Sequence, residues 1–291
     1  MPAATAFGRI IVGVDDSASC QRALRWAAGE AARRGAPLAI MYASTLPVAT
    51  WPVPPIPSGY MEYQADRAQD ILGRARAVAG AIVGDTVPVS TEFVVATPTA
   101  ALVEATGSAG MVVVGSRGRG ALARTILGSV STGVVHRAEC PVAVIHDEEA
   151  PSDADAPVLL GFDGSAASDA AVALAFEEAS LRQVNLVALH AWWSPGAFEM
   201  PGFDWESIRP EVDREVSAQL AGWQQRYRDV TVERVVVPDR PAQRLIERSR
   251  SVQLMIMGRR GLGAVASTLL GSVSGAVVQA ARVPLILAGP R

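Results

Sequence analysis

The chain has 291 residues, 49% of them hydrophobic and 19% charged, which is typical of a globular protein and predicts about two domains, each with its own core. Its 26 basic and 29 acidic side chains give a formal net charge of −3, so we expect neither nucleic acid nor an anionic membrane as a partner. Two cysteines and three scattered histidines argue against a disulfide scaffold or a zinc site, and the lack of a leader or of a run of about 18 apolar residues predicts a cytoplasmic protein.

The first half alternates short apolar runs with helix-like segments. Residues 9–14 are almost wholly apolar, as is typical of a strand buried in a parallel sheet. Ser17 or Asp16 can cap the helix that follows, and Gly35 can end it. The later elements that we expect are a strand at 37–43, a proline-rich loop at 46–59, a helix at 60–83, a strand at 87–95, a helix at 98–108, a strand at 111–114, a helix at 129–138 and a strand at 141–145.

An acidic segment separates the two halves. Residues 147–157 combine Asp and Glu with Pro, Ser and Ala and lack apolar periodicity, so they are predicted to be a linker. The predicted domains are therefore residues 1–146 and residues 158–291.

The whole pattern starts again after the linker. A strand-like run at 158–162 leads into Asp163-Gly164-Ser165, which repeats Asp15-Asp16-Ser17 after 148 residues. We expect Ser165 to cap a helix that ends near residue 181. The later elements that we expect are a strand at 184–191, a loop at 192–205, a helix at 206–228, a strand at 231–237, a helix at 241–249 and a strand at 253–257.

The most specific motif occurs once in each half. It reads Gly, two residues, Gly, nine residues, Gly-Ser, and it begins at Gly115 and again at Gly258, each time after an apolar run. A strand that leads into a glycine-rich loop and a Ser-capped helix presents backbone N–H groups beside the positive end of a helix dipole, which suits phosphate. Flexible turns alone could explain one copy, but two copies at identical spacing favour a phosphate-binding loop in each half. The loop residues expected to bind the ligand are Gly115, Arg117, Gly118, Arg119, Gly128, Ser129, Val130 and Ser131 in the first half, and Gly258, Arg260, Gly261, Leu262, Gly271, Ser272, Val273 and Ser274 in the second.

Strands that alternate with helices predict an α/β fold of two tandem, doubly wound, Rossmann-like domains with mainly parallel sheets. Ligands of such sheets lie beyond the carboxyl ends of the strands, where the strand order reverses. With a strand order of 3-2-1-4-5, Asp15 faces the loop at 115–131 and Asp163 faces the loop at 258–274. Each aspartate can accept hydrogen bonds from ribose or base, or can serve only as a helix N-cap. The other residues expected near the ligand are Gly13, Ser17 and Ala43 in the first half and Gly161, Ser165 and Ala191 in the second. Exposed backbone near Ala43 and Ala191 could recognise the edge of the base.

Sharper enzymatic motifs are missing from the sequence. A Walker A loop needs Lys before Ser or Thr, whereas Leu127 precedes Gly128-Ser129, and the turn after the first strand is not the G-x-G-x-x-G of dinucleotide-binding proteins. We therefore expect no catalytic residue and no metal-binding residue. Four tryptophans could stack on an adenine, although such residues more often cover a core: Trp51, Trp192, Trp193 and Trp205.

These motifs together resemble a known family. The segments Val12-Gly13-Val14-Asp15-Asp16-Ser17 and Gly161-Phe162-Asp163-Gly164-Ser165, with the two glycine loops, make the chain similar to tandem universal stress proteins of the ATP-binding type, over residues 8–146 and 157–288. The double arrangement resembles the actinobacterial, especially the mycobacterial, form. The resemblance implies a five-stranded parallel sheet of order 3-2-1-4-5 in each domain.

The resemblance also implies a ligand and a mode of association. It implies one ATP per domain, with or without Mg²⁺, the aspartate holding the adenosine part and the loop holding the phosphates. It further implies edge-to-edge association through residues 142–145 and 285–287, and hence a homodimer or a higher oligomer. His190 stands where the first half has Tyr42, which suggests that the two sites differ in affinity.

We therefore expect an ATP-binding regulator of the stress response and growth, with slow hydrolysis at most. Nucleotide occupancy would order the glycine loops and change the surface presented to a regulatory protein partner. Two alternatives stay open: an ATPase or phosphoryl-transfer enzyme, which would show turnover, and a dimerising scaffold that holds no nucleotide.

Overall fold

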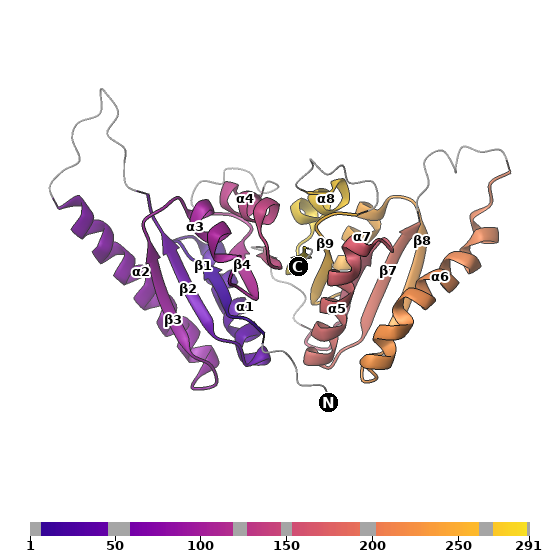
Figure 1. Cartoon of the computed structure of the whole chain (residues 1–291), viewed down its shortest axis with the longest axis horizontal. Coiled ribbons are helices and arrows are strands. Elements are labelled where there is room, and N and C mark those ends of the chain that lie inside the picture. Colours follow the sequence, from indigo (N-terminus) through magenta and orange to yellow (C-terminus); the bar gives the residue numbers. More distant parts are fainter. Residues whose placement is uncertain are drawn as a thin grey trace, which may run out of the picture. The chain divides into compact units, whose positions relative to one another are not determined.

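The structure is a computed structural model that describes residues 7–45, 59–118, 127–146, 153–192, 202–261 and 270–289. These residues belong to two compact units, residues 1–147 and 148–291, and each unit builds a parallel sheet flanked by helices (Figure 1).

In the first unit the strands pair in the order β3-β2-β1-β4-β5, and every neighbouring pair is parallel. Its elements are β1 (Ile10–Gly13), α1 (Ala18–Arg34), β2 (Leu38–Ala43), α2 (Tyr60–Val83), β3 (Val89–Val94), α3 (Pro98–Ala105), β4 (Met111–Gly115), α4 (Ser129–Arg137) and β5 (Val142–Ile145).

The second unit repeats this arrangement as β8-β7-β6-β9-β10, again with parallel neighbours. Its elements are β6 (Val158–Phe162), the short 3-10 helix η1 (Ala166–Ser168), α5 (Asp169–Arg182), β7 (Leu186–Trp192), α6 (Trp205–Arg226), β8 (Val232–Pro238), α7 (Pro241–Ser249), β9 (Leu254–Gly258), α8 (Ser272–Ala280) and β10 (Leu285–Ala288).

The helices form two groups in each unit. In the first unit α1 packs against α2, and α3 packs against α4. In the second unit Phe176 of α5 stacks on Trp223 of α6, and α7 packs against α8. The two groups cover opposite faces of each sheet because right-handed crossovers run outward from β1 to β3 and then return across the sheet to β4. The predicted doubly wound fold, with strand order 3-2-1-4-5 in each domain, is confirmed.

The first strand and helix form for the reasons visible in the sequence. Ile10, Ile11 and Val12 have no exposed surface, which matches the apolar run of a strand covered on both faces. The Ser17 hydroxyl accepts a hydrogen bond from the Cys20 N–H at the start of α1, and Gly35 adopts φ 60° at its end. Ser17 is therefore the N-cap of α1.

The equivalent helix of the second unit begins later than predicted. Ser165 does not cap α5; it precedes η1, and its hydroxyl donates to Asp163 Oδ1 at 2.6 Å. The Ser168 hydroxyl donates back to the Ser165 carbonyl at 2.7 Å, which tightens this turn into a 3-10 helix. The α-helix starts only at Asp169 because Ser165 and Ser168 are both engaged in that turn.

Several predicted boundaries also shift. Helices α2 and α7 match the predicted ranges. Helix α3 ends at Ala105 and not at residue 108, because the Thr106 N–H is shared between the Leu102 and Val103 carbonyls in a last tight turn. Strand β7 includes Trp192 and α6 begins at Trp205, so the loop predicted between them is shorter. The predicted proline-rich loop falls, except for Gly59, outside the described residues.

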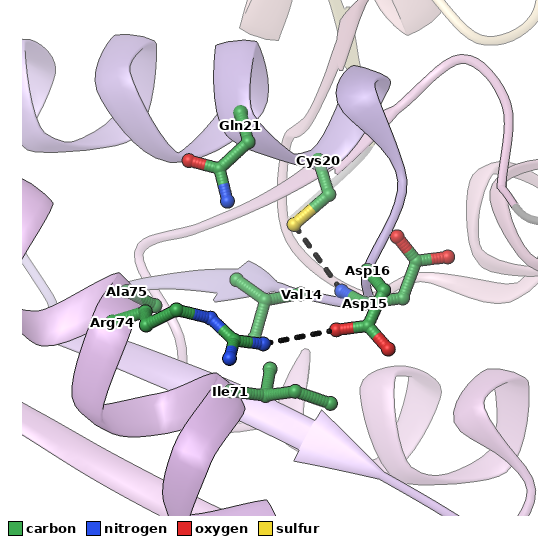
Figure 2. Close-up of a pocket in the computed structure, with 8 residues that line it drawn as sticks. All are labelled: Val14, Asp15, Asp16, Cys20, Gln21, Ile71, Arg74 and Ala75. Atoms are coloured by element: carbon green, nitrogen blue, oxygen red, sulfur yellow. Dashed lines mark hydrogen bonds and ion pairs between the residues drawn. The ribbon is translucent and has the colours of Figure 1, made fainter.

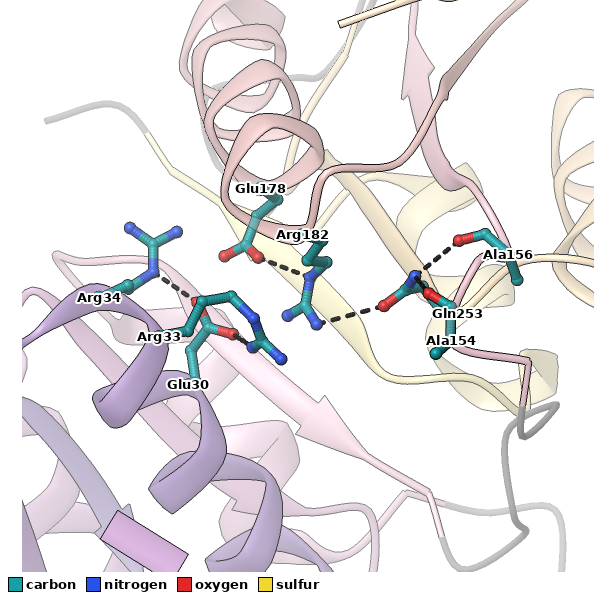
Figure 3. Close-up of polar contacts among 8 residues, drawn as sticks. All are labelled: Glu30, Arg33, Arg34, Ala154, Ala156, Glu178, Arg182 and Gln253. Atoms are coloured by element: carbon teal, nitrogen blue, oxygen red, sulfur yellow. Dashed lines mark hydrogen bonds and ion pairs between the residues drawn. The ribbon is translucent and has the colours of Figure 1, made fainter. Parts of the chain in front are cut away.

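A buried carboxylate occupies the same place near the end of the first helix in both units (Figure 3). Glu30 of α1 accepts hydrogen bonds from Arg33 at 2.8 Å and from Arg34 at 2.5 Å. Glu178 of α5, 148 residues later, accepts one from Arg182 at 2.9 Å. Buried carboxylates require such partners, because an uncompensated buried charge costs about 3–5 kcal/mol.

A glutamine attaches the segment before β6 to the second unit. The Gln253 side-chain amide donates to the carbonyls of Ala154 at 2.8 Å and Ala156 at 2.7 Å (Figure 3). These contacts lie in the second half of the predicted linker, whose first residues, 147–152, fall outside the described part of the chain. The limits of the linker and of the two domains stay predictions.

No helix within the described residues is both long enough and apolar enough to cross a membrane.

Candidate functional site

An aspartate follows the first strand of each unit and is held by the next turn. Asp15 Oδ1 accepts hydrogen bonds from the Ser17 N–H at 2.8 Å and from the Ser17 hydroxyl at 2.5 Å. In the second unit Asp163 Oδ1 accepts the same two bonds from Ser165, at 3.0 and 2.6 Å. Neither aspartate is a helix N-cap, because Ser17 and Ser165 hold those positions.

The second glycine of each loop lies against the other oxygen of the aspartate. A Cβ atom added to Gly118 would lie 3.1 Å from Asp15 Oδ2, and one added to Gly261 would overlap Asp163 Oδ2. The first strand and the glycine loop therefore meet at the point where the strand order reverses, between β1 and β4 and between β6 and β9.

The two ends of each loop are tied together by backbone hydrogen bonds. The Gly128 N–H donates to the Ser116 carbonyl at 2.8 Å, and the Gly271 N–H donates to the Arg259 carbonyl at 2.9 Å. Of the residues between these ends, 119–126 and 262–269 lie outside the described part of the chain, and they include the predicted site residues Arg119 and Leu262.

The helices that follow the loops have no side-chain cap. Gly128 and Gly271 are the N-caps of α4 and α8, so the predicted serine caps are wrong at both places: Ser129 and Ser272 are already the first helical residues. A helix start without a side-chain cap leaves N–H groups of its first turn available to an external acceptor, and its dipole favours a negative charge there. The neighbouring Val130 and Val273 belong to the same first turn.

Two of the predicted serines shape the loop. The Ser131 hydroxyl donates to the Gly115 carbonyl at 2.6 Å, and the Ser274 hydroxyl donates to the carbonyls of Arg259 at 2.8 Å and Gly271 at 3.0 Å. Both side chains are buried. Their hydroxyl groups thus fix the path of the backbone that presents the helix start.

The glycines of the first strands allow close packing. A Cβ on Gly13 would lie 2.8 Å from Leu102 Cδ1 of α3, and one on Gly161 would lie 2.8 Å from Leu245 Cδ2 of α7. Contact of these glycines with a ligand stays a prediction, as does backbone recognition of a base. The residues predicted for that recognition, Ala43 and Ala191, lie at the carboxyl ends of β2 and β7.

Ser19 supports the first loop, a role that the sequence pattern does not predict. It is buried in the first turn of α1, where its hydroxyl accepts a hydrogen bond from the Arg117 N–H at 3.4 Å. A Cβ on Gly115 would lie 2.5 Å from the same hydroxyl, so Gly115 is also required by this contact. The two partners are 98 residues apart, and no local pattern joins them.

A pocket of about 330 Å³ adjoins Asp15 on the side of α1 and α2 (Figure 2). Asp16 lies at this pocket and pairs with Arg74 at 3.3 Å and with Arg67 at 2.9 Å. Cys20 Sγ accepts a hydrogen bond from the Asp15 N–H at 3.2 Å, and burial raises the pKa of the Cys20 thiol to about 11, so the thiol is protonated and a poor nucleophile. The pocket has no lining residue from the glycine loop, so it is distinct from the space between Asp15 and Gly118.

The aromatic residues after β7 contact one another. Trp192 stacks on Phe203 with ring centroids 5.8 Å apart, and it also meets Trp205 at 5.8 Å. This cluster fits the covering role that tryptophans more often have. Trp51 and Trp193 lie outside the described residues.

His190 supports the strand end that carries Asp163. Its Nδ1 lies 3.2 Å from the Phe162 carbonyl, which requires the tautomer with a proton on Nδ1, and its ring packs on Phe162 with centroids 5.5 Å apart. Burial lowers the pKa of His190 below its ordinary value of 6.5, against the hydrogen bond to Phe162 and the charges of Asp163 and Glu215, which all raise it.

Because of His190, we expect the free energy of unfolding to decrease as the pH is lowered. Below about pH 6.5 the unfolded chain binds a proton at this residue, whereas the folded chain binds it only at a lower pH. This contribution is complete above the unfolded pKa and decreases as the pH falls toward the folded pKa. Urea unfolding at about pH 7.5 and about pH 5.5 should show a smaller pH effect in His190→Tyr, which carries the residue found at the equivalent Tyr42. Identical pH profiles in the two proteins would contradict this role.

Comparisons with known proteins by sequence and by structure all point to the same family. The sequence pattern of the universal stress protein family matches residues 6–146 and 156–288. A universal stress protein of Mycobacterium tuberculosis strain H37Rv is 47% identical over 283 residues, which cover 96% of each protein. One of Mycolicibacterium smegmatis is 44% identical over 292 residues, which cover 99% of each. The crystal structure of a universal stress protein from Archaeoglobus fulgidus DSM 4304 has a TM-score of 0.72 at 19% identity over 97% of this chain and 96% of that one, a likeness of fold.

Proposed function

This chain belongs to the universal stress protein family, and from that premise we propose that it binds one ATP in each domain and acts as a nucleotide-dependent regulator of the stress response and growth. One observation carries the proposal. In both domains the aspartate after the first strand meets the second glycine of the loop, directly beside a helix start without a side-chain cap.

The loop and the helix start supply the groups that phosphates need. Backbone N–H groups in the first turns of α4 and α8 bind phosphate oxygens, aided by the helix dipole. Arg117 and Arg260, next to the loop glycines Gly118 and Gly261, add charge-assisted hydrogen bonds. Magnesium would enter with the phosphates of the nucleotide.

The aspartates supply the other end of the site. Asp15 and Asp163 each have one oxygen held by a serine, which fixes the carboxylate and directs Oδ2 toward the loop. A fixed carboxylate at this place accepts hydrogen bonds from ribose hydroxyl groups. The carboxyl ends of β2 and β7, at Ala43 and Ala191, present backbone groups to the base.

The nucleotide content of the purified protein tests this proposal. We expect about two ATP per chain, falling to about one in Asp15→Ala and in Asp163→Ala, because each variant loses the ribose acceptor of one domain. The measurement is acid release of bound small molecules, followed by chromatography and a count per chain. Association through residues 142–145 and 285–287, a regulatory partner and a cytoplasmic location stay predictions.

The same experiment separates the alternatives. Bound ADP or AMP, together with turnover that needs magnesium and is lost in the aspartate variants, would favour an ATPase or phosphoryl-transfer enzyme. Empty sites after incubation with ATP and magnesium would contradict nucleotide binding and favour a scaffold.

A further inference from the structure

The second glycine loop contains a buried arginine where the first contains a serine. Arg259 follows Gly258 and is 6% exposed, and Ser116, at the equivalent place 143 residues earlier, is also buried. Arginine is almost never buried to this extent unless it is paired.

The surroundings of Arg259 include a glycine that makes room for it. A Cβ atom added to Gly289, just after β10, would overlap the Arg259 guanidinium group. In the first domain the residue equivalent to Gly289 is His146, which lies just after β5. The first domain therefore has a small residue in the loop, Ser116, and a large one after the last strand, His146. The second domain has the reverse, with the large Arg259 in the loop and Gly289 after the last strand.

The backbone of Arg259 joins the last strand to the start of α8. Its N–H donates to the Ala288 carbonyl at 2.8 Å, and its carbonyl accepts hydrogen bonds from the Gly271 N–H at 2.9 Å and the Ser274 hydroxyl at 2.8 Å. A shift of the Arg259 backbone would therefore move both the end of the loop and the first turn of the helix.

The first domain closes its loop differently. Ser116 makes the equivalent backbone bonds to Ile145 at 2.7 Å and to Gly128 at 2.8 Å. The Ser131 hydroxyl, however, donates to Gly115 and not to Ser116. The second loop is thus held by one additional bond to the residue whose side chain rests on Gly289.

We propose that Arg259, packed against Gly289, is a positioning residue for the phosphate-binding loop of the second domain. The nucleotide affinity of this domain then depends on the contact between Arg259 and Gly289, which the first domain lacks because it has Ser116 and His146 at these places. The effect on affinity rests on the proposed nucleotide function. The effect on the loop does not, because the hydrogen bonds of Gly271 and Ser274 to Arg259 need no ligand.

Gly289→Ala tests the proposal in the full chain. The added methyl group requires the enclosed guanidinium group to move. We expect the confined side chain to pass this shift to its own backbone and so to the Gly271 N–H. We expect faster amide hydrogen exchange at residues 271–274 without nucleotide, and, with the first site silenced by Gly118→Val, about a tenfold weaker binding of ATP. The double variant Arg259→Ser with Gly289→Ala removes the displaced side chain, so it should recover most of the exchange protection. His146→Ala, at the equivalent position of the first domain, is the control and should leave residues 271–274 unchanged.

Two results would overturn the proposal. One is unchanged exchange in a folded Gly289→Ala protein, and the other is a double variant that exchanges as fast as Gly289→Ala, which would assign the effect to residue 289 itself. If the unsubstituted protein binds no ATP, the proposed function fails, and the exchange measurement still decides whether Arg259 positions the loop.

Discussion

Gly261→Val is expected to empty the nucleotide site of the second domain while the first domain keeps its ligand. Any side chain at residue 261 enters the space beside Asp163 Oδ2, which is where the proposed function places the ribose and phosphates. Because the carboxylate is also held by Ser165, it cannot move aside without losing two hydrogen bonds. We expect a loss of affinity of about 100-fold or more, equivalent to about 2.8 kcal/mol, measured by calorimetric titration with ATP.

Matched variants make this result specific. Gly118→Val should empty the first site in the same way, and the double variant should bind no ATP. Gly222→Val is the control for the second domain because nothing lies within 4 Å of a Cβ at Gly222, on the exposed part of α6. Affinities within about threefold of the original protein in both loop variants would show that the site is placed wrongly.

Phe176→Ala is expected to destabilise the second domain by about 3–5 kcal/mol, which is a large part of the stability of an ordinary domain. Phe176 has no exposed surface, and its ring lies 6.2 Å from the ring of Trp223 and 5.9 Å from that of Tyr227. The first domain has Ala28 at the equivalent place, so the aromatic cluster belongs to the second domain. Urea unfolding followed by circular dichroism measures the loss, and hydrogen exchange assigns it to β6–β10.

The same helix provides the control for this variant. Leu181→Ala removes a side chain that is 37% exposed, and it should change the free energy of unfolding by about 0.5 kcal/mol or less. The first domain should keep its exchange protection in both variants, because distant sites contribute independently. A loss below about 1 kcal/mol in Phe176→Ala would mean that the cluster repacks around the missing ring.

The two domains are equivalent in strand order and differ in several side chains and in the 3-10 helix before α5. Both have the same strand order and the same contact between an aspartate and a loop glycine. They differ at Tyr42 and His190, and at Ser116 and Arg259, although the spacing of the motif is identical. With nucleotide bound in both domains as proposed, such differences would let the two sites respond to different nucleotide concentrations.

The sequence by itself determined the order of the elements, the duplication and the place where the ligand is expected. Apolar runs, helix periodicity and glycine spacing are local signals, and right-handed crossovers leave one simple strand order for five alternating units. The meeting of Asp15 with the glycine loop could be anticipated for this reason, since both follow strands that lie side by side in that order.

Only the tertiary structure decided which side chains complete the two sites. Three contacts join residues whose pairing leaves no periodic pattern: Ser19 with the first loop, Gly13 with Leu102, and Arg259 with Gly289. These details depend on the volumes and hydrogen bonds of side chains brought together by folding, often about 100 residues apart in the chain. Local sequence therefore fixes where a loop and a strand end meet, and packing fixes which atoms face each other there.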